Sequence, residues 1–223
     1  MRIKTTLLGA ALSLAVAPVA ANAATTVSVR IEGAKRTLLP VKRVQLPAGR
    51  VTKSGAGCSA DSAAGALDAA THDKWAGTFS QSLSDFFVTG ILGESYASRT
   101  ASSWWEILVN DVESQSGVCG TKLRRGDRVV FAAVPISGVA YPLVLHGPAS
   151  ARVGQSVTVT VEDYVGVHAK PAAGVVVTGH GVKSKSDRRG QVKIRITQTG
   201  TLTLQAGGKG YIRAAPLLIS ERP

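Results

Sequence analysis

Several residue types are scarce in this chain of 223 residues. Aromatic residues make up 5% of the sequence, there are two cysteines, and 14 acidic residues stand against 26 basic ones. Beyond the first 23 residues, no apolar stretch approaches the ~20 residues that cross a membrane, so we expect no transmembrane segment after signal cleavage. An apolar fraction of 44% is still enough for a packed core, and the chain is not predicted to be disordered.

Motifs for catalysis and for metal binding are also missing. No serine occupies a nucleophile-elbow pattern, and the acidic residues are spread along the chain rather than paired. Neither HExxH nor HxH spacing occurs, and no histidine has metal-ligand spacing to a cysteine; the histidines are His72, His146, His168 and His180. We therefore expect no enzyme activity, no catalytic residue, no metal site and no cofactor.

The N-terminus has the three parts of a secretory signal peptide. A positively charged start is followed by an uncharged apolar run over residues 7–20, and Ala21-Asn22-Ala23 has the small-x-small form that signal peptidases accept. This pattern predicts a signal peptide over residues 1–23, cleaved near Ala23-Ala24. An uncleaved anchor is the alternative, but the apolar run is short for a membrane span. We expect a secreted protein that is extracellular or associated with the cell surface.

Cys58 and Cys119 are expected to form a disulfide bond. Two cysteines in an oxidising compartment are more often paired than free, and both are flanked by small residues that suit loops. On the chain-entropy model, such a bond would stabilise the fold by ~4 kcal/mol. The alternatives, a metal site or a reactive thiol, would need histidine or cysteine partners that the local sequence lacks.

Positive charge is concentrated in the second part of the chain. From Pro142 onward, 11 basic and 4 acidic residues give a net charge of +7, and residues 24–141 carry only +3. The densest cluster surrounds the tip of a predicted hairpin and consists of Lys183, Lys185, Arg188 and Arg189. Such a cluster can contact an anionic cell-envelope polymer or a surface protein, or it can be a solvated face with no partner. A secreted protein is not expected to bind nucleic acid.

Composition and periodicity divide the chain into two domains, over residues 24–134 and 142–223, joined by a Pro- and Gly-rich linker at 135–148. The first domain contains one Ala-rich helix, predicted over 60–71, that Ser59 or Asp61 can cap. Its strands are predicted at 27–31, 41–46, 86–91, 104–109 and 128–131. A small sheet that covers one helix indicates an α+β domain of β-grasp type.

The second domain is predicted to be all β. Apolar and polar residues alternate over 156–161 and 192–196, further apolar strands are predicted at 175–177 and 217–219, and glycine-rich turns separate them. This pattern indicates a β-sandwich, and about 80 residues suit an immunoglobulin-like module. Because few contacts are expected to cross the linker, the two domains are predicted to fold independently.

Trp104 and Trp105 are the candidate contact residues of the first domain. Neighbouring side chains in a strand face opposite sides, so one indole is expected in the core and the other on the opposite face. The sequence does not distinguish them. An outward tryptophan can stack on a sugar ring or pack into a partner, or it can pack against a nearby loop or the other domain.

Four segments of the first domain resemble the family related to the C-terminal domain of transcobalamin, many of whose bacterial members are secreted. They are VSVRIEG at 27–33, AGALDAAT at 64–71, WEILVN at 105–110 and LRRGDRVVF at 123–131. The resemblance implies a β-grasp fold and a non-enzymatic role in binding a ligand or a surface. It implies cobalamin only by analogy, because transcobalamin holds its ligand against a large helical domain that has no counterpart here.

The second domain resembles bacterial immunoglobulin-like or carboxypeptidase-regulatory-like modules. The matching segments are PAAGV at 171–175, SDRRGQV at 186–192, GTLTL at 200–204 and GYIR at 210–213. This resemblance implies a fold and leaves the function open. We expect a secreted, non-enzymatic binding or cell-surface accessory protein that contacts an anionic envelope polymer or a partner protein. The alternative is an extracellular carrier of a small, cobalamin-like ligand on the first domain.

Overall fold

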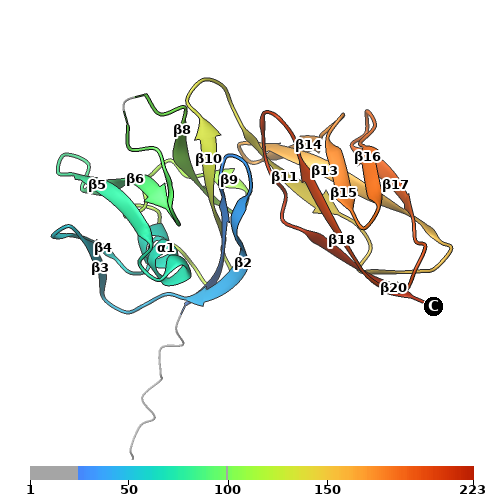
Figure 1. Cartoon of the computed structure of the whole chain (residues 1–223). Coiled ribbons are helices and arrows are strands. Elements are labelled where there is room, and N and C mark those ends of the chain that lie inside the picture. Colours follow the sequence, from blue (N-terminus) through green and yellow to red (C-terminus); the bar gives the residue numbers. More distant parts are fainter. Residues whose placement is uncertain (1–24, 99) are drawn as a thin grey trace, which may run out of the picture.

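The computed structural model describes residues 25–98 and 100–223, which form twenty strands and one helix. Figure 1 shows two halves side by side, the first ending with β10 and the second beginning with β11. The predominance of strands agrees with the glycine- and valine-rich sequence. The predicted signal peptide over residues 1–23 lies outside the described residues. Within them, no helix is long and apolar enough to cross a membrane.

The first half is built on a five-stranded sheet in the order β2-β1-β10-β8-β9. Its central pair, β1 (Thr26–Glu32) and β10 (Arg128–Pro135), is parallel, and the other pairs are antiparallel. The outer strands are β2 (Thr37–Gln45), β8 (Ser103–Val109) and β9 (Val112–Glu113). Because β1 and β10, the first and last strands of this half, pair with each other in the sheet, the residues between them belong to the same half.

Helix α1 (Ala63–Thr71) packs against one face of this sheet (Figure 1). Its small side chains allow a close approach. At Gly65, an added Cβ would lie only 1.9 Å from the carbonyl oxygen of Ala60, so a side chain at this position would clash with the backbone. The helix was predicted from the alanine-rich sequence, but the predicted caps are wrong. The N-cap is Ser62, which makes no side-chain capping bond because its hydroxyl donates to the carbonyl of Ser59.

Two small sheets lie on the other side of α1 (Figure 1). One is the hairpin of β3 (Arg50–Lys53) and β4 (Ala56–Ser59), and the other joins β5 (Trp75–Ser80), β6 (Asp85–Ile91) and β7 (Glu94–Ser95). The predicted disulfide is confirmed: Cys58 in β4 is bonded to Cys119, with 5.0 Å between the two Cα atoms. It connects the β3–β4 hairpin to the segment that precedes β10.

The second half consists of two sheets that share one apolar core. One sheet has the order β14-β13-β11-β19, with β17 also paired to β13, and the other has the order β12-β20-β18-β15-β16. The strands of the first are β11 (Tyr141–His146), β13 (Ser156–Val165), β14 (His168–Pro171), β17 (Gln191–Arg195) and β19 (Tyr211–Ile212). Those of the second are β12 (Ser150–Arg152), β15 (Val176–Gly179), β16 (Val182–Lys185), β18 (Gly200–Gly207) and β20 (Leu217–Arg222).

The connection between the halves is shorter than the predicted linker over 135–148. Strand β11 lies within that range, because Leu143 and Leu145 alternate into the core of the second half. Only residues 136–140 separate β10 from β11. The proline and glycine residues that indicated a linker therefore flank a strand.

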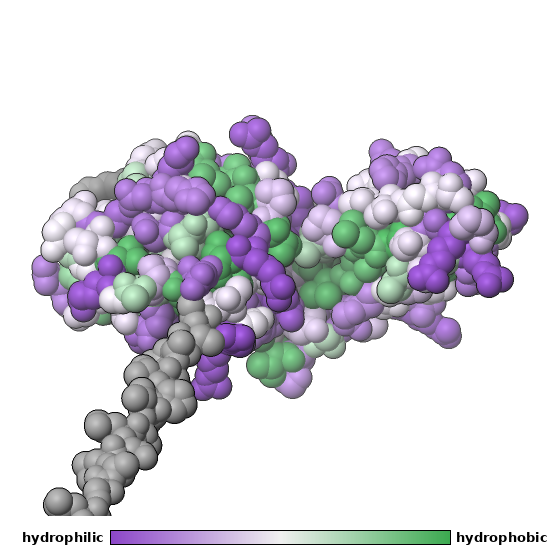
Figure 2. Space-filling model, turned by 90° about the horizontal axis from the view of Figure 1, so that it is seen from below, coloured by the Kyte–Doolittle hydropathy of each residue, from purple (hydrophilic) through white to green (hydrophobic). Residues whose placement is uncertain are grey.

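The face of the first sheet opposite α1 packs against the second half. Leu108, Val130, Ala132 and Val134 form an apolar cluster with Ile212 of β19. Beside it, the side chains of Arg30 and Glu32 on β1 are buried, 5% and 3% exposed. Figure 2 shows apolar surface where the two lobes meet.

Buried charges extend this junction. The guanidinium of Arg213 donates to Glu32 over 2.8 Å and to the carbonyl of Gly33, and Arg30 donates to the carbonyl of Arg213. Arg30 also pairs with Glu32 at 2.8 Å. The Pro- and Gly-rich linker predicted few contacts between the halves, whereas the structure has a continuous set of apolar and ionic ones. Independent folding of the two halves stays a prediction.

Candidate functional site

The two adjacent tryptophans of β8 face opposite sides of the sheet. Trp105 is 5% exposed and packs into the core below the sheet, where its ring lies 5.5 Å from that of Tyr96. Trp104 faces the other way and is 46% exposed. The structure thus decides what the sequence left open: Trp104 is the outward residue, and it lies on the face of the sheet that the second half covers only in part.

Trp104 lies between two hollows. One, of about 230 Å³, is at the junction of the halves, and the other, of about 570 Å³, is on the first half. Both are lined by Trp104, Glu106 and Glu113, so together they form one groove across the end of β8 and β9. We call these two hollows the Trp104 groove.

The walls of the groove come from both halves. At the junction they include the connection at residues 138–140 together with Tyr141, Pro142 and Tyr164 of the second half. On the first half they include Leu83, Phe86 and Phe87. Leu83 and Phe87 are 64% and 60% exposed, so the larger hollow has an apolar rim that is open to solvent.

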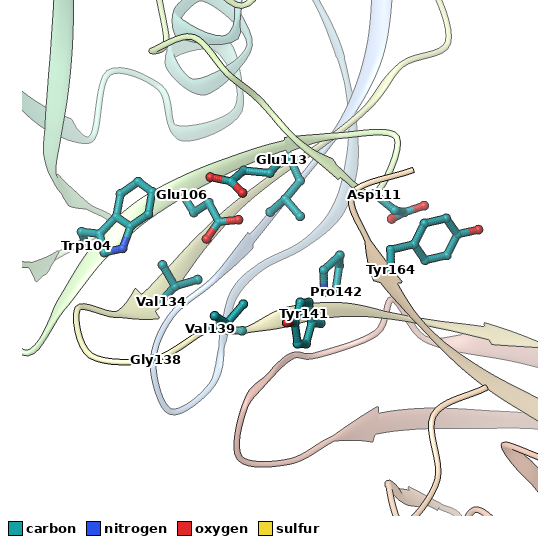
Figure 3. A pocket seen from close by; sticks show the side chains of 13 residues that line it. Trp104, Glu106, Asp111, Glu113, Val134, Gly138, Val139, Tyr141, Pro142 and Tyr164 are labelled. Atoms are coloured by element: carbon teal, nitrogen blue, oxygen red, sulfur yellow. The ribbon is translucent and has the colours of Figure 1, made fainter. Parts of the chain in front are cut away.

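Glu106 is the most unusual residue of the groove. It is 8% exposed, although it follows Trp104 by two positions and faces the same side. Figure 3 shows its carboxyl group next to that of Glu113, between Trp104 on one side and Asp111 on the other. Burial, together with the negative charge of Glu113, raises the pKa of Glu106 to about 7. Among residues 25–98 and 100–223, no hydrogen bond or ion pair reaches this carboxyl group.

Two of the other three acidic side chains of the groove have partners within the protein. Asp111 pairs with Arg128 at 2.6 Å. Asp85 accepts hydrogen bonds from the backbone N–H groups of Cys119 and Gly120, at 2.8 and 3.0 Å, and so holds the loop that carries the disulfide. Glu113 is exposed, and no ion pair to it is formed within the described part of the chain. Two carboxylates, Glu106 and Glu113, are therefore available to a ligand.

No basic side chain lines either hollow within the described residues. Two basic side chains lie close to lining residues: Arg128 pairs with Asp111 at 2.6 Å, and Nζ of Lys170 lies 5.4 Å from the ring centroid of Tyr141 and 4.0 Å from Oδ1 of Asp163. In a chain with a net charge of +12, a groove lined by four acidic residues and no basic one is a distinct electrostatic environment.

The predicted basic cluster lies elsewhere, and its predicted hairpin is wrong. Lys183 and Lys185 are on β16, which pairs with β15, whereas the next strand, β17, pairs with β13 of the other sheet. Arg188 and Arg189 therefore lie on a crossover between the two sheets. The reason is the buried Ser186, which bonds to the backbone of Ala172 and Val175 and turns the chain.

All four basic residues of the cluster are exposed, and none of them forms an ion pair with a residue in the described ranges. Their charges are thus uncompensated among the described residues. Asp187 lies among them, but its carboxylate accepts the backbone N–H groups of Arg189 and Gln191, which lowers its pKa.

The histidines do not gather into a site. The Nε2 atom of His72 lies 3.1 Å from Lys42, and that of His146 lies 3.1 Å from Glu162. Across the described part of the chain, no group of three or more His, Cys, Asp or Glu side chains could hold a metal ion.

Glu106, Glu113 and Tyr141 were not predicted as site residues from the sequence. A charged residue that alternates with Trp104 in an otherwise apolar strand was a usable signal for Glu106. No sequence signal pointed to Glu113 or Tyr141, because they reach the groove through the pairing of β9 with β8 and the docking of the second half.

A known family matches the part of the chain that contributes the first-half wall of the groove. Residues 60–134, about a third of the chain, match the family described as a domain of unknown function, DUF4430, which is found in transcobalamin-like proteins. The match begins just before α1 and ends in β10, so it includes Trp104, Glu106 and Glu113 but not the second-half wall of the groove. No curated protein matches the chain.

Proposed function

We propose that the chain is a secreted, non-enzymatic binding protein that holds its ligand in the Trp104 groove. The observation that carries the proposal is a half-exposed tryptophan between two hollows, one of which has a volume within the ~300–1,000 Å³ of small-molecule sites. The flat indole offers a stacking surface for a sugar ring of an envelope polymer or for a side chain of a partner protein. The alternative role, carriage of a small ligand on the first domain, would use the same groove.

Two finer assignments belong to this proposal. The mixed sheet with one helix on one face supports a β-grasp domain, and the paired sheets of the second half support an immunoglobulin-like module. The Cys58–Cys119 disulfide supports an oxidising, extracytoplasmic compartment.

Retention on purified envelope material tests the function. Wild type, Trp104→Ala and Leu218→Ala are incubated with cell-wall and membrane fractions, and the bound fraction is measured after sedimentation. Leu218 is the matched control, because it is 57% exposed and lies outside the groove. We expect Trp104→Ala to weaken retention at least tenfold and Leu218→Ala to leave it unchanged. Retention that is equal in all three proteins, or turnover of the material by the wild type, would overturn the proposal.

The basic cluster supports a second candidate function, electrostatic contact with an anionic envelope polymer. It rests on four exposed cations that have no ion-pair partner among the described residues. Exposed charges act together over a patch, and salt screens them with a Debye length of ~8 Å near physiological ionic strength. Binding of the protein to anionic wall polymer should weaken steeply with salt. Changing Lys183, Lys185, Arg188 and Arg189 to Gln should remove most of this binding, and binding that survives both treatments would refute this candidate.

A further inference from the structure

The two unpaired carboxylates of the Trp104 groove face the same space. Glu106 is on β8 and Glu113 is on β9, opposite Leu108, so both side chains lie on the side of the sheet turned toward the groove. Figure 3 shows their carboxyl groups adjacent. Glu106 is more than nine-tenths buried, and no donor or cation reaches it within residues 25–98 and 100–223.

A buried carboxyl group without a partner is unfavourable when ionised, and a second carboxylate beside it adds repulsion. A cation placed between the two would be attracted by both. An indole face attracts cations as well, through the negative potential above its ring, when the charge lies within about 6 Å of the ring centre. The carboxylates of Glu106 and Glu113 and the indole face of Trp104 therefore attract a cation by two independent interactions.

We propose that the Trp104 groove binds a ligand through an organic ammonium group, held between the carboxylates of Glu106 and Glu113 beside the indole of Trp104. This deepens the proposed function and rests on it. Ammonium groups of this kind occur in amino sugars and in quaternary amines such as choline. A metal ion is not the expected occupant, because fewer than three clustered ligands are present in the described structure.

The neighbours of Glu106 are compatible with a cation. Glu113 of β9, Asp111 of the β8–β9 turn and Asp85 at the start of β6 supply negative charge, and Asp111 is neutralised by Arg128. Tyr141 and Tyr164 of the second half line the junction. Besides Arg128, Lys170 lies near the junction, with its Nζ 5.4 Å from the ring centroid of Tyr141 and 4.0 Å from Oδ1 of Asp163, and it does not line the groove.

Pairs of probes that differ only in charge test the proposal. Choline is compared with its uncharged isostere 3,3-dimethyl-1-butanol, and glucosamine with glucose, by NMR of the indole N–H groups at pH 7.5 and low salt. The chain has three tryptophans, and a Trp104→Phe variant assigns the signal of Trp104. We expect a cationic probe to shift this signal at concentrations at which its neutral partner does not. The pair that responds distinguishes a quaternary amine from an amino sugar.

Charge variants provide the second arm. Glu106→Gln and Glu113→Gln should each weaken binding of the cationic probe at least tenfold. Glu162→Gln, which removes a carboxylate of β13 that does not line the groove, should bind as the wild type does. Equal binding of charged and neutral probes, or unchanged binding in both groove variants, would overturn the ammonium site.

The affinity for choline is also measured as a function of pH. The charge of choline does not titrate, so a change in affinity with pH reports on the protein, and a purely structural role of Glu106 would not produce it. The ionised fraction of a group with a pKa of about 7 rises about tenfold between pH 6 and pH 8, and the affinity should rise with it. The rise should be absent in Glu106→Gln. If Trp104→Ala abolishes retention on envelope material while Glu106→Gln does not, the proposed function stands and the ammonium site is refuted.

Discussion

Trp104 and Trp105 are neighbours in the sequence, but one indole is half-exposed and the other is buried. Trp105 is enclosed in the core of the first half, and its indole N–H has no hydrogen-bond partner among the described residues. Trp104 is half-exposed above the groove. The pair therefore separates a contribution to stability from a contribution to binding.

Truncation of each tryptophan should show this separation. We expect Trp105→Ala to lower the free energy of unfolding by about 3–5 kcal/mol, because it leaves a large cavity, and Trp104→Ala to lower it by less than about 1 kcal/mol. Urea denaturation followed by circular dichroism measures both. Similar losses for the two variants would contradict the assignment of Trp104 to the surface.

Glu106 should make the stability depend on pH in a predictable direction. Its pKa is raised to about 7 in the folded state, so between about pH 4.5 and 7 the folded protein keeps a proton that the unfolded chain has lost. The contribution to stability is therefore fully present at low pH and is lost as the pH rises through 7. Glu106→Gln removes this loss, and we expect it to stabilise the protein by about 1–2 kcal/mol at pH 8.

At about pH 3 the same variant should have the stability of the wild type, because the wild-type carboxyl group is then largely neutral in both states. Denaturation midpoints at the two pH values check the prediction. A variant that is less stable than the wild type at pH 8 would show that the ionised Glu106 has a partner in the folded protein.

The disulfide joins two segments of the first half that are not part of its five-stranded sheet. Cys58 belongs to the two-stranded β3–β4 hairpin, and Cys119 to the loop fixed by Asp85. A hairpin of two short strands is marginally stable by itself. The bond and the packing of α1 against the hairpin compensate for that weakness.

Removing the disulfide should therefore destabilise the first half. Changing both Cys58 and Cys119 to Ala should lower the free energy of unfolding by about 2–4 kcal/mol, as expected for a closed loop of 61 residues. Guanidinium chloride denaturation measures the loss. Intact mass after alkylation is the accompanying control, and uptake of two alkyl groups without prior reduction would show that the bond is absent in solution.

On the scale of the whole molecule, the junction between the halves determines the shape of the groove. One wall comes from β8 and β9, and the facing wall comes from β11 and β13. The buried Arg30–Glu32 pair and Arg213 hold these walls together on the other side of the apolar cluster. A change at the junction should therefore affect both the connection between the halves and binding in the groove.

Arg213→Ala tests this coupling. The variant loses two hydrogen bonds to the first half, one of them to the buried carboxylate of Glu32, and we expect a loss of about 1–3 kcal/mol in the free energy of unfolding. Limited proteolysis should cut the variant faster than the wild type within residues 136–140, where Ile136 and Val139 are exposed. Two stable fragments would support independent folding, and equal cutting rates would show that Arg213 does not hold the junction.

Local patterns were sufficient for most of the framework. Alternation predicted β1, β13 and β17, the strands β8 and β10 were also predicted, and alanine content predicted α1. The two cysteines predicted the disulfide because compartment and cysteine count already favour pairing. The N-cap of α1 and the crossover at Arg188 could not be predicted. The first N–H groups of the helix bond to the carbonyls of Thr121 and Val118, and the crossover depends on the bonds of Ser186 to Ala172 and Val175.

What the sequence by itself determined is therefore the set of elements, the covalent cross-link and the excess of positive charge, since each follows from neighbouring residues or from composition. The tertiary structure alone decided which tryptophan is outward, that Glu106 is buried without a partner in the described structure, and that residues of both halves enclose one groove. The reason is physical. Burial and pKa depend on groups that the fold brings together from positions far apart in the chain, and a local pattern carries no information about them.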